Sequence, residues 1–237
     1  MSDPTTSPRL RLDPAVAERF PHYSGLIVYA FGLVNGPSDE ASVARLRAAE
    51  AAARLVFADQ RPADHPHVAA WRRAYGAFGA KPSKYPCSVE ALLGRTVKGQ
   101  DLPAINRCVD LYNAVSLRHV LPVGGEDLDT LDGDLTLTFA TGDECFDLPD
   151  GDSETSRPEP GEAIWVDRAG VTCRRWNWRQ GRRTRLTETS RNAYFVLDRL
   201  APFTVEALRA AGDELIDLLI GSSPGARFDS ELLGASV

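Results

Sequence analysis

The spacing of apolar residues predicts that the chain opens with a buried strand and continues with helices. Residues 25–34, GLIVYAFGLV, form a nearly continuous apolar run, and the turn-forming residues NGPSDE follow it. Ser38 is then the expected N-cap, with Asp39 and Glu40 in the first turn, of a helix over the alanine-rich residues 41–59. Two further helices are predicted over residues 67–75 and 88–97, the second with Ser88 as its N-cap.

A fourth helix is predicted over residues 105–121. Ile105, Val109, Tyr112 and Val115 recur at helical spacing, and Asn106 is a plausible cap. Near the C-terminus, Thr204 should cap a closing helix that runs to about residue 219.

Between these two helices the period of the apolar pattern falls from about 3.6 residues to 2, which indicates strands. Short strands are predicted over residues 134–140, 144–148, 162–166 and 171–178. The polar residues 149–161 should form an exposed loop, and the aromatic and branched residues 193–200 favour a further strand.

This order of elements predicts an α+β fold in one compact unit, with helices first, then sheet, then a closing helix. A chain of 237 residues can bury a sizeable core. We expect a single domain over residues 13–222, a disordered tail over residues 1–12 and a flexible C-terminal tail over residues 223–237.

Charge is distributed unevenly along the chain. The net charge is −6, yet residues 173–185, CRRWNWRQGRRTR, hold six arginines, two tryptophans and no acidic residue, so the remainder carries −12. An acidic chain argues against nonspecific coating of nucleic acid, and we expect no DNA partner. A local basic site for RNA remains compatible with this balance.

The arginine-rich stretch has two interpretations. If it is an extended strand, Arg174, Trp176 and Trp178 share one face and can stack on a base or an aromatic ligand. Alternatively, the tryptophans enter the core and the arginines solvate its rim.

The remaining composition points to a cytoplasmic protein. The four cysteines are 21, 37 and 28 residues apart, which matches no zinc or redox motif, and no apolar stretch reaches the length of about 18 residues that a membrane span needs. We therefore expect reduced thiols, no membrane association and no metal.

Two other segments are candidates for binding chemistry. Lys81, Lys84 and Tyr85 lie on a loop before a helix N-terminus, where an anion can be held, although a solvated loop is the plainer alternative. In residues 121–129, LPVGGEDLD, two glycines are followed by Glu126 and Asp127. Carboxylates beside exposed amides can bind an ammonium group or position a water, or the segment is only a glycine turn.

Three segments together, KPSKYPCSVEALL, INRCVDLYNAVSLRHVLPVGGEDLD and VTCRRWNWRQGRRTRLTETSRNA, resemble the free-standing relatives of the B3/B4 editing domain of the phenylalanyl-tRNA synthetase beta subunit. The resemblance spans roughly residues 71–219. That domain hydrolyses tyrosine wrongly attached to the phenylalanine tRNA. The resemblance implies a three-layer α+β fold around an unusual β-sandwich, no metal or other cofactor, and a pocket for an aminoacyl group on the 3′ end of tRNA.

The resemblance carries over only in part. The family's pocket asparagine falls on Asn113, but its histidine falls on Gly124, and its tyrosine-selecting glutamate falls at or near Asp198. Its glycine-rich turn is replaced here by residues 176–178. These departures imply a smaller or differently shaped acyl group than tyrosine.

From these observations we expect an aminoacyl-tRNA deacylase that acts in trans on the acceptor end of tRNA. The alternative is a non-catalytic module that binds an amino acid, an aminoacyl group or tRNA, for example as an accessory to a biosynthetic pathway that uses aminoacyl-tRNA. The expected catalytic residues are Asn113, Gly124, Gly125 and Glu126, and the expected substrate-binding residues are Trp176, Asn177, Trp178, Asp198 and Asp127. The expected RNA-binding residues are Lys81, Lys84, Tyr85, Arg174, Arg175, Arg179, Arg182, Arg183 and Arg185.

Overall fold

The computed structural model describes residues 8–147 and 157–234 of the chain. Its helices are α1 (Pro14–Arg19), α2 (Glu40–Val56), α3 (Pro66–Ala77), α4 (Ser88–Thr96), α5 (Arg107–His119) and α6 (Val205–Ser222), with 3-10 turns η1 (Pro62–Asp64) and η2 (Leu128–Thr130). Its strands are β1 (Leu10–Leu12), β2 (Ser24–Phe31), β3 (Val123–Asp127), β4 (Leu135–Phe139), β5 (Ala163–Asp167), β6 (Gly170–Arg174), β7 (Arg179–Gln180), β8 (Asn192–Arg199) and β9 (Arg227–Gly234).

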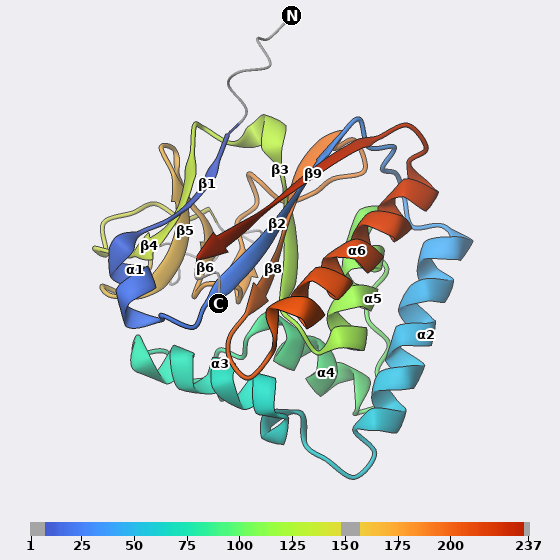
Figure 1. Cartoon of the computed structure of the whole chain (residues 1–237), viewed down its shortest axis with the longest axis horizontal. Helices are drawn as coiled ribbons and strands as arrows, with labels where there is room; N and C mark the ends of the chain where they lie inside the picture. Colours follow the sequence, from blue (N-terminus) through green and yellow to red (C-terminus); the bar gives the residue numbers. More distant parts are fainter. Residues whose placement is uncertain (1–7, 148–156, 235–237) are drawn as a thin grey trace, which may run out of the picture.

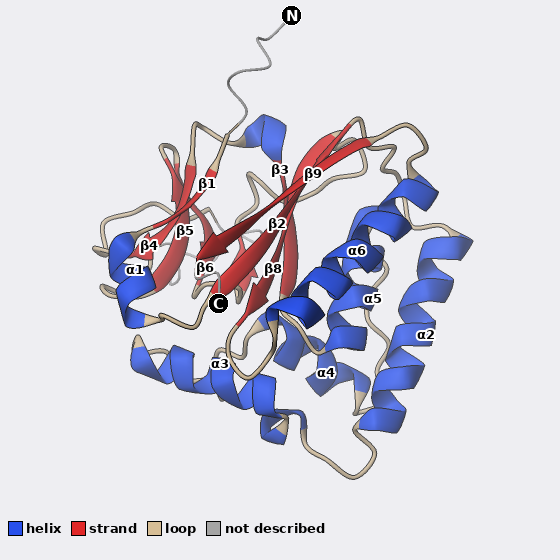
Figure 2. Cartoon of the chain, in the orientation of Figure 1, coloured by secondary structure: helices blue, strands red, loops and turns tan. Residues whose placement is uncertain are grey.

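Two sheets and a helical layer stack on one another (Figures 1 and 2). One sheet has the strand order β1-β4-β5-β6-β7 and the other β3-β8-β2-β9. The second sheet lies in the middle, with the first sheet on one face and α5 and α6 on the other (Figure 1). The predicted α+β, three-layer architecture is therefore confirmed.

The middle sheet explains the continuous apolar run near the start of the chain. In β2, Leu26 and Val28 point into the core beneath α5 and α6, whereas Ile27 and Tyr29 point into the core between the two sheets. Because both faces of this strand are buried, its sequence lacks the polar alternation of a half-exposed strand.

Two of the four predicted N-caps, Asn106 and Thr204, agree with the structure, and two are displaced by one residue. The Asn106 side chain accepts a hydrogen bond from Val109 N, and Thr204 caps α6. The cap of α2 is Asp39 rather than Ser38, because Asp39 and Ser42 exchange the two hydrogen bonds of a capping box. Similarly, Cys87 occupies the N-cap of α4, and Ser88 is the first helical residue.

The predicted strand over residues 171–178 is wrong beyond Arg174. Arg175 and Trp176 have φ angles of 47° and 66°, so the chain turns in the left-handed region before the short strand β7 begins. Such angles are costly for residues with a Cβ atom, and nothing in an alternating pattern predicts them. Trp176 and Trp178 therefore do not share a strand face.

Two other expectations in this region differ from the structure. Residues 144–147 form no strand, and Phe146 makes only a single bridge to Val171. Most of the predicted loop over residues 149–161 lies outside the described residues, as does residue 148.

The chain ends also contribute strands that the pattern did not predict. Of the predicted N-terminal tail, residues 1–7 lie outside the described part and residues 10–12 form β1, which pairs in parallel with β4. The predicted flexible C-terminal tail contains β9, which pairs with β2 over its whole length. Phe228 and Leu232 pack against the core beneath α6, and Tyr29 Oη donates to Glu231 at 2.6 Å. These contacts fix the segment in place.

Candidate functional site

A cavity of about 230 Å³ opens where the edge strand β3 meets α4, α5 and the turn between β6 and β7. Aromatic side chains form much of its wall, and several polar groups converge on it. The lining residues are Ser88, Ala91, Leu92, Tyr112, Asn113, Val123, Gly124, Gly125, Glu126, Trp165, Cys173, Trp176, Asn177, Trp178, Arg179, Gln180, Tyr194 and Val196.

All four predicted catalytic residues line this cavity. Residues 121–129 are not a glycine turn, because Gly124, Gly125 and Glu126 lie within β3, paired with β8. Asn113 reaches the cavity from α5, where it is half-buried. The structure thus brings two separate predicted segments to one place.

Gly125 has no room for a side chain. A Cβ atom there would lie 2.6 Å from Cδ1 of Phe195 on the neighbouring strand. The Gly125 carbonyl accepts a hydrogen bond from Gln180 Nε2 at 3.0 Å on the side away from β8, and Asp127 N donates to Thr184 O on that same side. Because N–H and C=O of one residue in an antiparallel strand point the same way, the Gly125 N–H also faces this outer edge.

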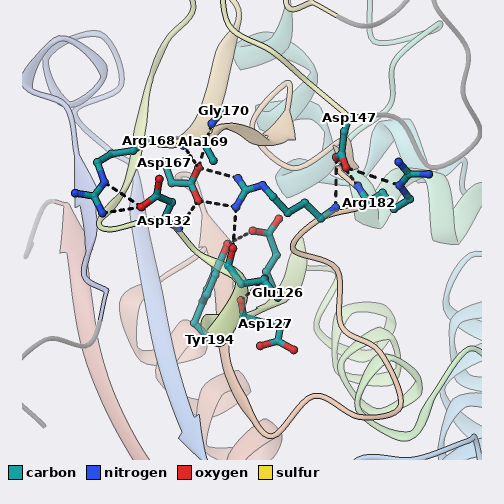
Figure 3. Close-up of polar contacts among 12 residues, drawn as sticks. Glu126, Asp127, Asp132, Asp147, Asp167, Arg168, Ala169, Gly170, Arg182 and Tyr194 are labelled. Carbon is teal, nitrogen blue, oxygen red and sulfur yellow. Dashed lines mark hydrogen bonds and ion pairs between the residues drawn. The ribbon is translucent and has the colours of Figure 1, made fainter. Parts of the chain in front are cut away.

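Glu126 places a carboxyl group on the face of β3 that looks toward the other sheet. It is 1% exposed, and Tyr194 Oη donates to its Oε2 at 2.6 Å (Figure 3). Burial raises the pKa of Glu126, while the hydrogen bond from Tyr194 opposes that rise.

The two indoles of the arginine-rich stretch have different roles. Trp176 is fully buried, and its ring lies 5.0 Å from Phe20, 4.9 Å from Tyr23 and 5.3 Å from Trp71, centroid to centroid. Trp178 is only half-buried and packs edge-on against Tyr85 at 5.0 Å. Trp176 is therefore a core residue that also borders the cavity, whereas Trp178 forms part of the cavity wall.

Asn177 lies between these indoles and belongs to a buried hydrogen-bond network. Its Oδ1 accepts from Tyr75 Oη at 2.9 Å, and its Nδ2 donates to Asp198 Oδ2 at 3.0 Å. Asp198 Oδ1 in turn accepts from Tyr23 Oη at 2.7 Å. Burial raises the pKa of Asp198 to about 6, against the opposing hydrogen bonds from Asn177 and Tyr23.

Two of the predicted substrate-binding residues do not line the cavity. Asp198 lies behind Asn177, with both carboxyl oxygens bonded within the protein. Asp127 points elsewhere, because its carboxyl accepts from Asp129 N and from Ser190 Oγ and so caps η2.

The predicted RNA-binding role of Arg174 and Arg175 is wrong, since both are buried. Arg174 Nε and Nη2 bond the two oxygens of Glu162 at 2.9 Å and 2.8 Å. The Arg175 guanidinium lies 3.7 Å above the Tyr85 ring and 4.6 Å from the Trp178 ring. These two arginines hold the turn instead of facing solvent, and the half-buried Tyr85 packs against Arg175 and Trp178.

The remaining predicted cations divide by exposure. Arg183 is half-buried and forms two hydrogen bonds with Asp167, at 2.9 Å and 2.7 Å. Arg182 is exposed; its backbone N donates to Asp147, and its Nε lies 3.8 Å from Asp147 Oδ2 in an exposed ion pair (Figure 3). Arg185 forms an isolated backbone β-bridge with Glu126, and its side chain is exposed. Lys81 and Lys84 are exposed as well. Arg179 is half-buried at the cavity.

Several cavity residues were not predicted from the sequence. They are Ser88, Tyr112, Trp165, Cys173, Gln180 and Tyr194. Tyr194 meets Glu126 across 68 residues of chain, and such pairings depend on strand register. Burial raises the pKa of Cys173 well above its ordinary value, which disfavours a reactive thiolate at this position.

The described residues contain neither a metal-binding cluster nor a membrane-spanning helix. No group of three or more histidine, cysteine, aspartate or glutamate side chains is placed to hold a metal ion. Within the same residues, no helix combines the length and the apolar character that crossing a membrane requires.

Comparison with known proteins places the chain in context. The family model of the B3/4 domain matches residues 70–212, which confirms the resemblance inferred from the sequence. A crystal structure of an N-terminal fragment of the phenylalanyl-tRNA synthetase beta subunit from Pyrococcus horikoshii is similar, with a TM-score of 0.48 and 9% identity. The match covers 95% of this chain and 50% of that one, so the chain spans about half its length. No curated protein matched.

Proposed function

Because the chain belongs to the B3/4 domain family, we propose that it is an aminoacyl-tRNA deacylase that acts in trans. One observation carries the proposal. A single cavity brings together Asn113 from α5, the backbone of Gly124 and Gly125, and the buried carboxyl of Glu126. These groups can bind an ester and direct a water onto it.

The size of the cavity favours one aminoacyl group. Its volume of about 230 Å³ lies below the roughly 300–1,000 Å³ of pockets for drug-sized ligands. Aromatic walls from Tyr112, Trp165 and Trp178 suit an amino-acid side chain, whereas the nucleotides of tRNA must remain outside.

Hydrolysis of the ester needs donors for the developing oxyanion and an acceptor for the proton of water. The Gly125 N–H at the outer edge of β3 and the Asn113 amide are suited to stabilise the oxyanion. Glu126, whose pKa is raised by burial, is suited to accept the proton as water adds to the carbonyl carbon. The proton then passes to the departing 3′ oxygen, which releases the amino acid and an uncharged tRNA.

The acceptor end of tRNA requires a cationic approach to the cavity. Lys81, Lys84, Arg182 and Arg185 are the exposed members of the predicted RNA-binding set, and we assign the phosphate contacts to them. Arg174 and Arg175, which are buried, act instead by fixing the turn that carries Trp178.

A panel of mischarged tRNAs incubated with the protein tests the proposal. At least one ester should hydrolyse faster than the uncatalysed background, and Glu126→Gln should lower that rate by roughly 10²-fold or more. Asp129→Asn, at an exposed carboxylate away from the cavity, is the matched control and should retain the rate. If every tRNA in the panel stays at the background rate, the deacylase proposal fails.

A second candidate function is a binding module without turnover. One observation favours it: burial raises the pKa values of Tyr112, Cys173 and Tyr194 still further above neutrality, so none of these three groups supplies an ionised nucleophile to the cavity. Calorimetry with non-hydrolysable aminoacyl-adenosine analogues separates the two candidates. Binding of an analogue together with no hydrolysis of the matching tRNA supports the module.

A further inference from the structure

The amide of Asn177 is held on both sides by groups that fix its orientation. An ionised carboxylate can only accept hydrogen bonds, so the atom facing Asp198 Oδ2 at 3.0 Å is the Asn177 nitrogen. The oxygen then faces Tyr75 Oη, which donates to it at 2.9 Å. Tyr23 occupies the other oxygen of Asp198 and stops the carboxyl from turning away.

The backbone of Asn177 is fixed as well. Its N–H donates to Arg175 O at 2.8 Å, and its carbonyl accepts from Ser88 N at the start of α4 at 3.1 Å. These bonds leave one N–H and one lone pair of the side-chain amide, and Asn177 lines the cavity. The remaining N–H and lone pair are the groups that this side chain can offer to a ligand, and their order is fixed by the two bonds.

We infer that Asn177 determines specificity by offering this oriented N–H to a hydrogen-bond acceptor on the bound acyl group, and that Asp198 is the positioning residue that sets its orientation. The inference rests on the proposed function, because it names the acyl class that the same cavity selects. A polar acyl group with an acceptor, such as a hydroxyl or amide oxygen, is preferred over an apolar group of equal size.

The protonation state of Asp198 controls the orientation. When Tyr23 keeps donating to Oδ1, the proton of the neutral carboxyl lies on Oδ2 and faces Asn177, so the amide rotates to place its oxygen there and its nitrogen toward Tyr75. The titratable groups nearest the carboxyl are Tyr23, Tyr75 and Cys173, and burial raises the pKa of each, so they stay neutral through this range. Since the pKa of Asp198 is about 6, rotation falls between mildly acidic and neutral pH.

Matched ligand pairs test the preference. The probes are 3′-aminoacylamino-3′-deoxyadenosines that carry threonine or valine, and asparagine or leucine, titrated calorimetrically at pH 7.5. The wild-type protein should bind the polar member of a pair about three- to tenfold more tightly, the range of one neutral hydrogen bond. Asp198→Asn should abolish or reverse this preference, because Tyr23 donates to the oxygen of the new amide and leaves its NH2 group facing Asn177, which then rotates. Asp129→Asn should keep it.

Nuclear magnetic resonance tests the orientation without any ligand. The side-chain amide resonances of Asn177, identified by their loss in Asn177→Ser, should shift with a midpoint near pH 6 in the wild-type protein. In Asp198→Asn they should stay at the low-pH position throughout. Resonances that do not titrate, or ligand pairs that bind equally to the wild-type protein, overturn the inference. If the same preparation still hydrolyses a mischarged tRNA, the deacylase proposal holds even though the inference about Asn177 fails.

Discussion

Trp176 shows how a single side chain can belong to the core and to a ligand cavity at once. Its ring is enclosed by Phe20, Tyr23, Trp71 and Phe78, and its backbone has a φ of 66°. A left-handed conformation costs roughly 1–2 kcal/mol for a residue with a side chain. Complete burial of a side chain as large as an indole offsets that cost.

Replacing the two indoles should separate their roles. Trp176→Ala should lower the free energy of unfolding by about 3–5 kcal/mol, as for other buried aromatic residues. Trp178→Ala, at a half-buried position, should cost less than half as much and change the affinity for aminoacyl-adenosine analogues. Urea unfolding and calorimetry measure the two effects. Equal losses of stability would contradict the assignment of Trp178 as a wall.

Asp198 should make stability depend on pH. Its folded pKa of about 6 exceeds the ordinary value of 3.8, so the native state binds more protons than the unfolded chain between these values. Stability from this group is therefore greatest at low pH and falls as pH rises from about 4 to about 6, by up to roughly 3 kcal/mol. Asp198→Asn should lack this step. Urea unfolding of both proteins at several pH values from 4.5 to 7.5 measures the difference in their free energies of unfolding. The same pH dependence in both proteins would contradict the assignment of this step to Asp198.

The positions of individual cavity residues were predictable only in part. Asn113, Gly124 and Glu126 follow from local motifs and the family resemblance, and the structure places all three at the cavity. Tyr194 and Asp198 depend on the pairing of β8 with its neighbours, which no local pattern specifies. The roles of the latter two therefore became visible only with the strand register.

Among the secondary-structure elements, helices and strands with strong periodicity were predicted, and irregular or short ones were not. The starting positions of α5 and α6 were predicted from Asn106 and Thr204, which are their N-caps. The turn after β6 could not be predicted, because Arg175 and Trp176 adopt angles that normally favour glycine. Long-range contacts of their side chains, with Glu162, Tyr85 and the core, determine that backbone.

The C-terminal strand offers a test of how much one edge element contributes. Deleting residues 227–237 removes β9 and leaves β2 as an unpaired edge. We expect a lower thermal unfolding temperature and self-association through the exposed strand, measured by circular dichroism and light scattering. Deleting only residues 235–237, beyond β9, is the control and should change neither. An unaltered unfolding temperature in the longer deletion would assign β9 a negligible role.

For the molecule as a whole, the burial of two arginines reconciles the acidic net charge with the arginine-rich stretch. Arg174 and Arg175 lie in the interior beside Glu162, so they add little to the field outside. The net charge of −6 opposes RNA everywhere except near the exposed lysines and arginines. Binding of tRNA should therefore occur in one orientation and be strongly dependent on salt.

The salt dependence of tRNA binding tests this division of the cations. Replacing Lys81, Lys84, Arg182 or Arg185 by glutamine should each lower the slope of log K against log salt by roughly 1 if the residue contacts a phosphate. Arg183→Gln, at a residue paired with Asp167, should instead lower stability and leave the slope unchanged. Filter-binding titrations at several salt concentrations give the slopes. Slopes equal to wild type in all four exposed variants would assign those residues to solvation.

The turn between β6 and β7 also constrains how this protein can diverge in evolution. Trp176 anchors the turn in the core, and Asn177 and Trp178 on the same turn face the cavity. A substitution at the Trp176 anchor therefore tends to unfold the protein before it can acquire a new ligand. Inherited changes in ligand preference should accumulate instead at Ala91 of α4, which lines the cavity and is exposed, so that its substitution costs little stability.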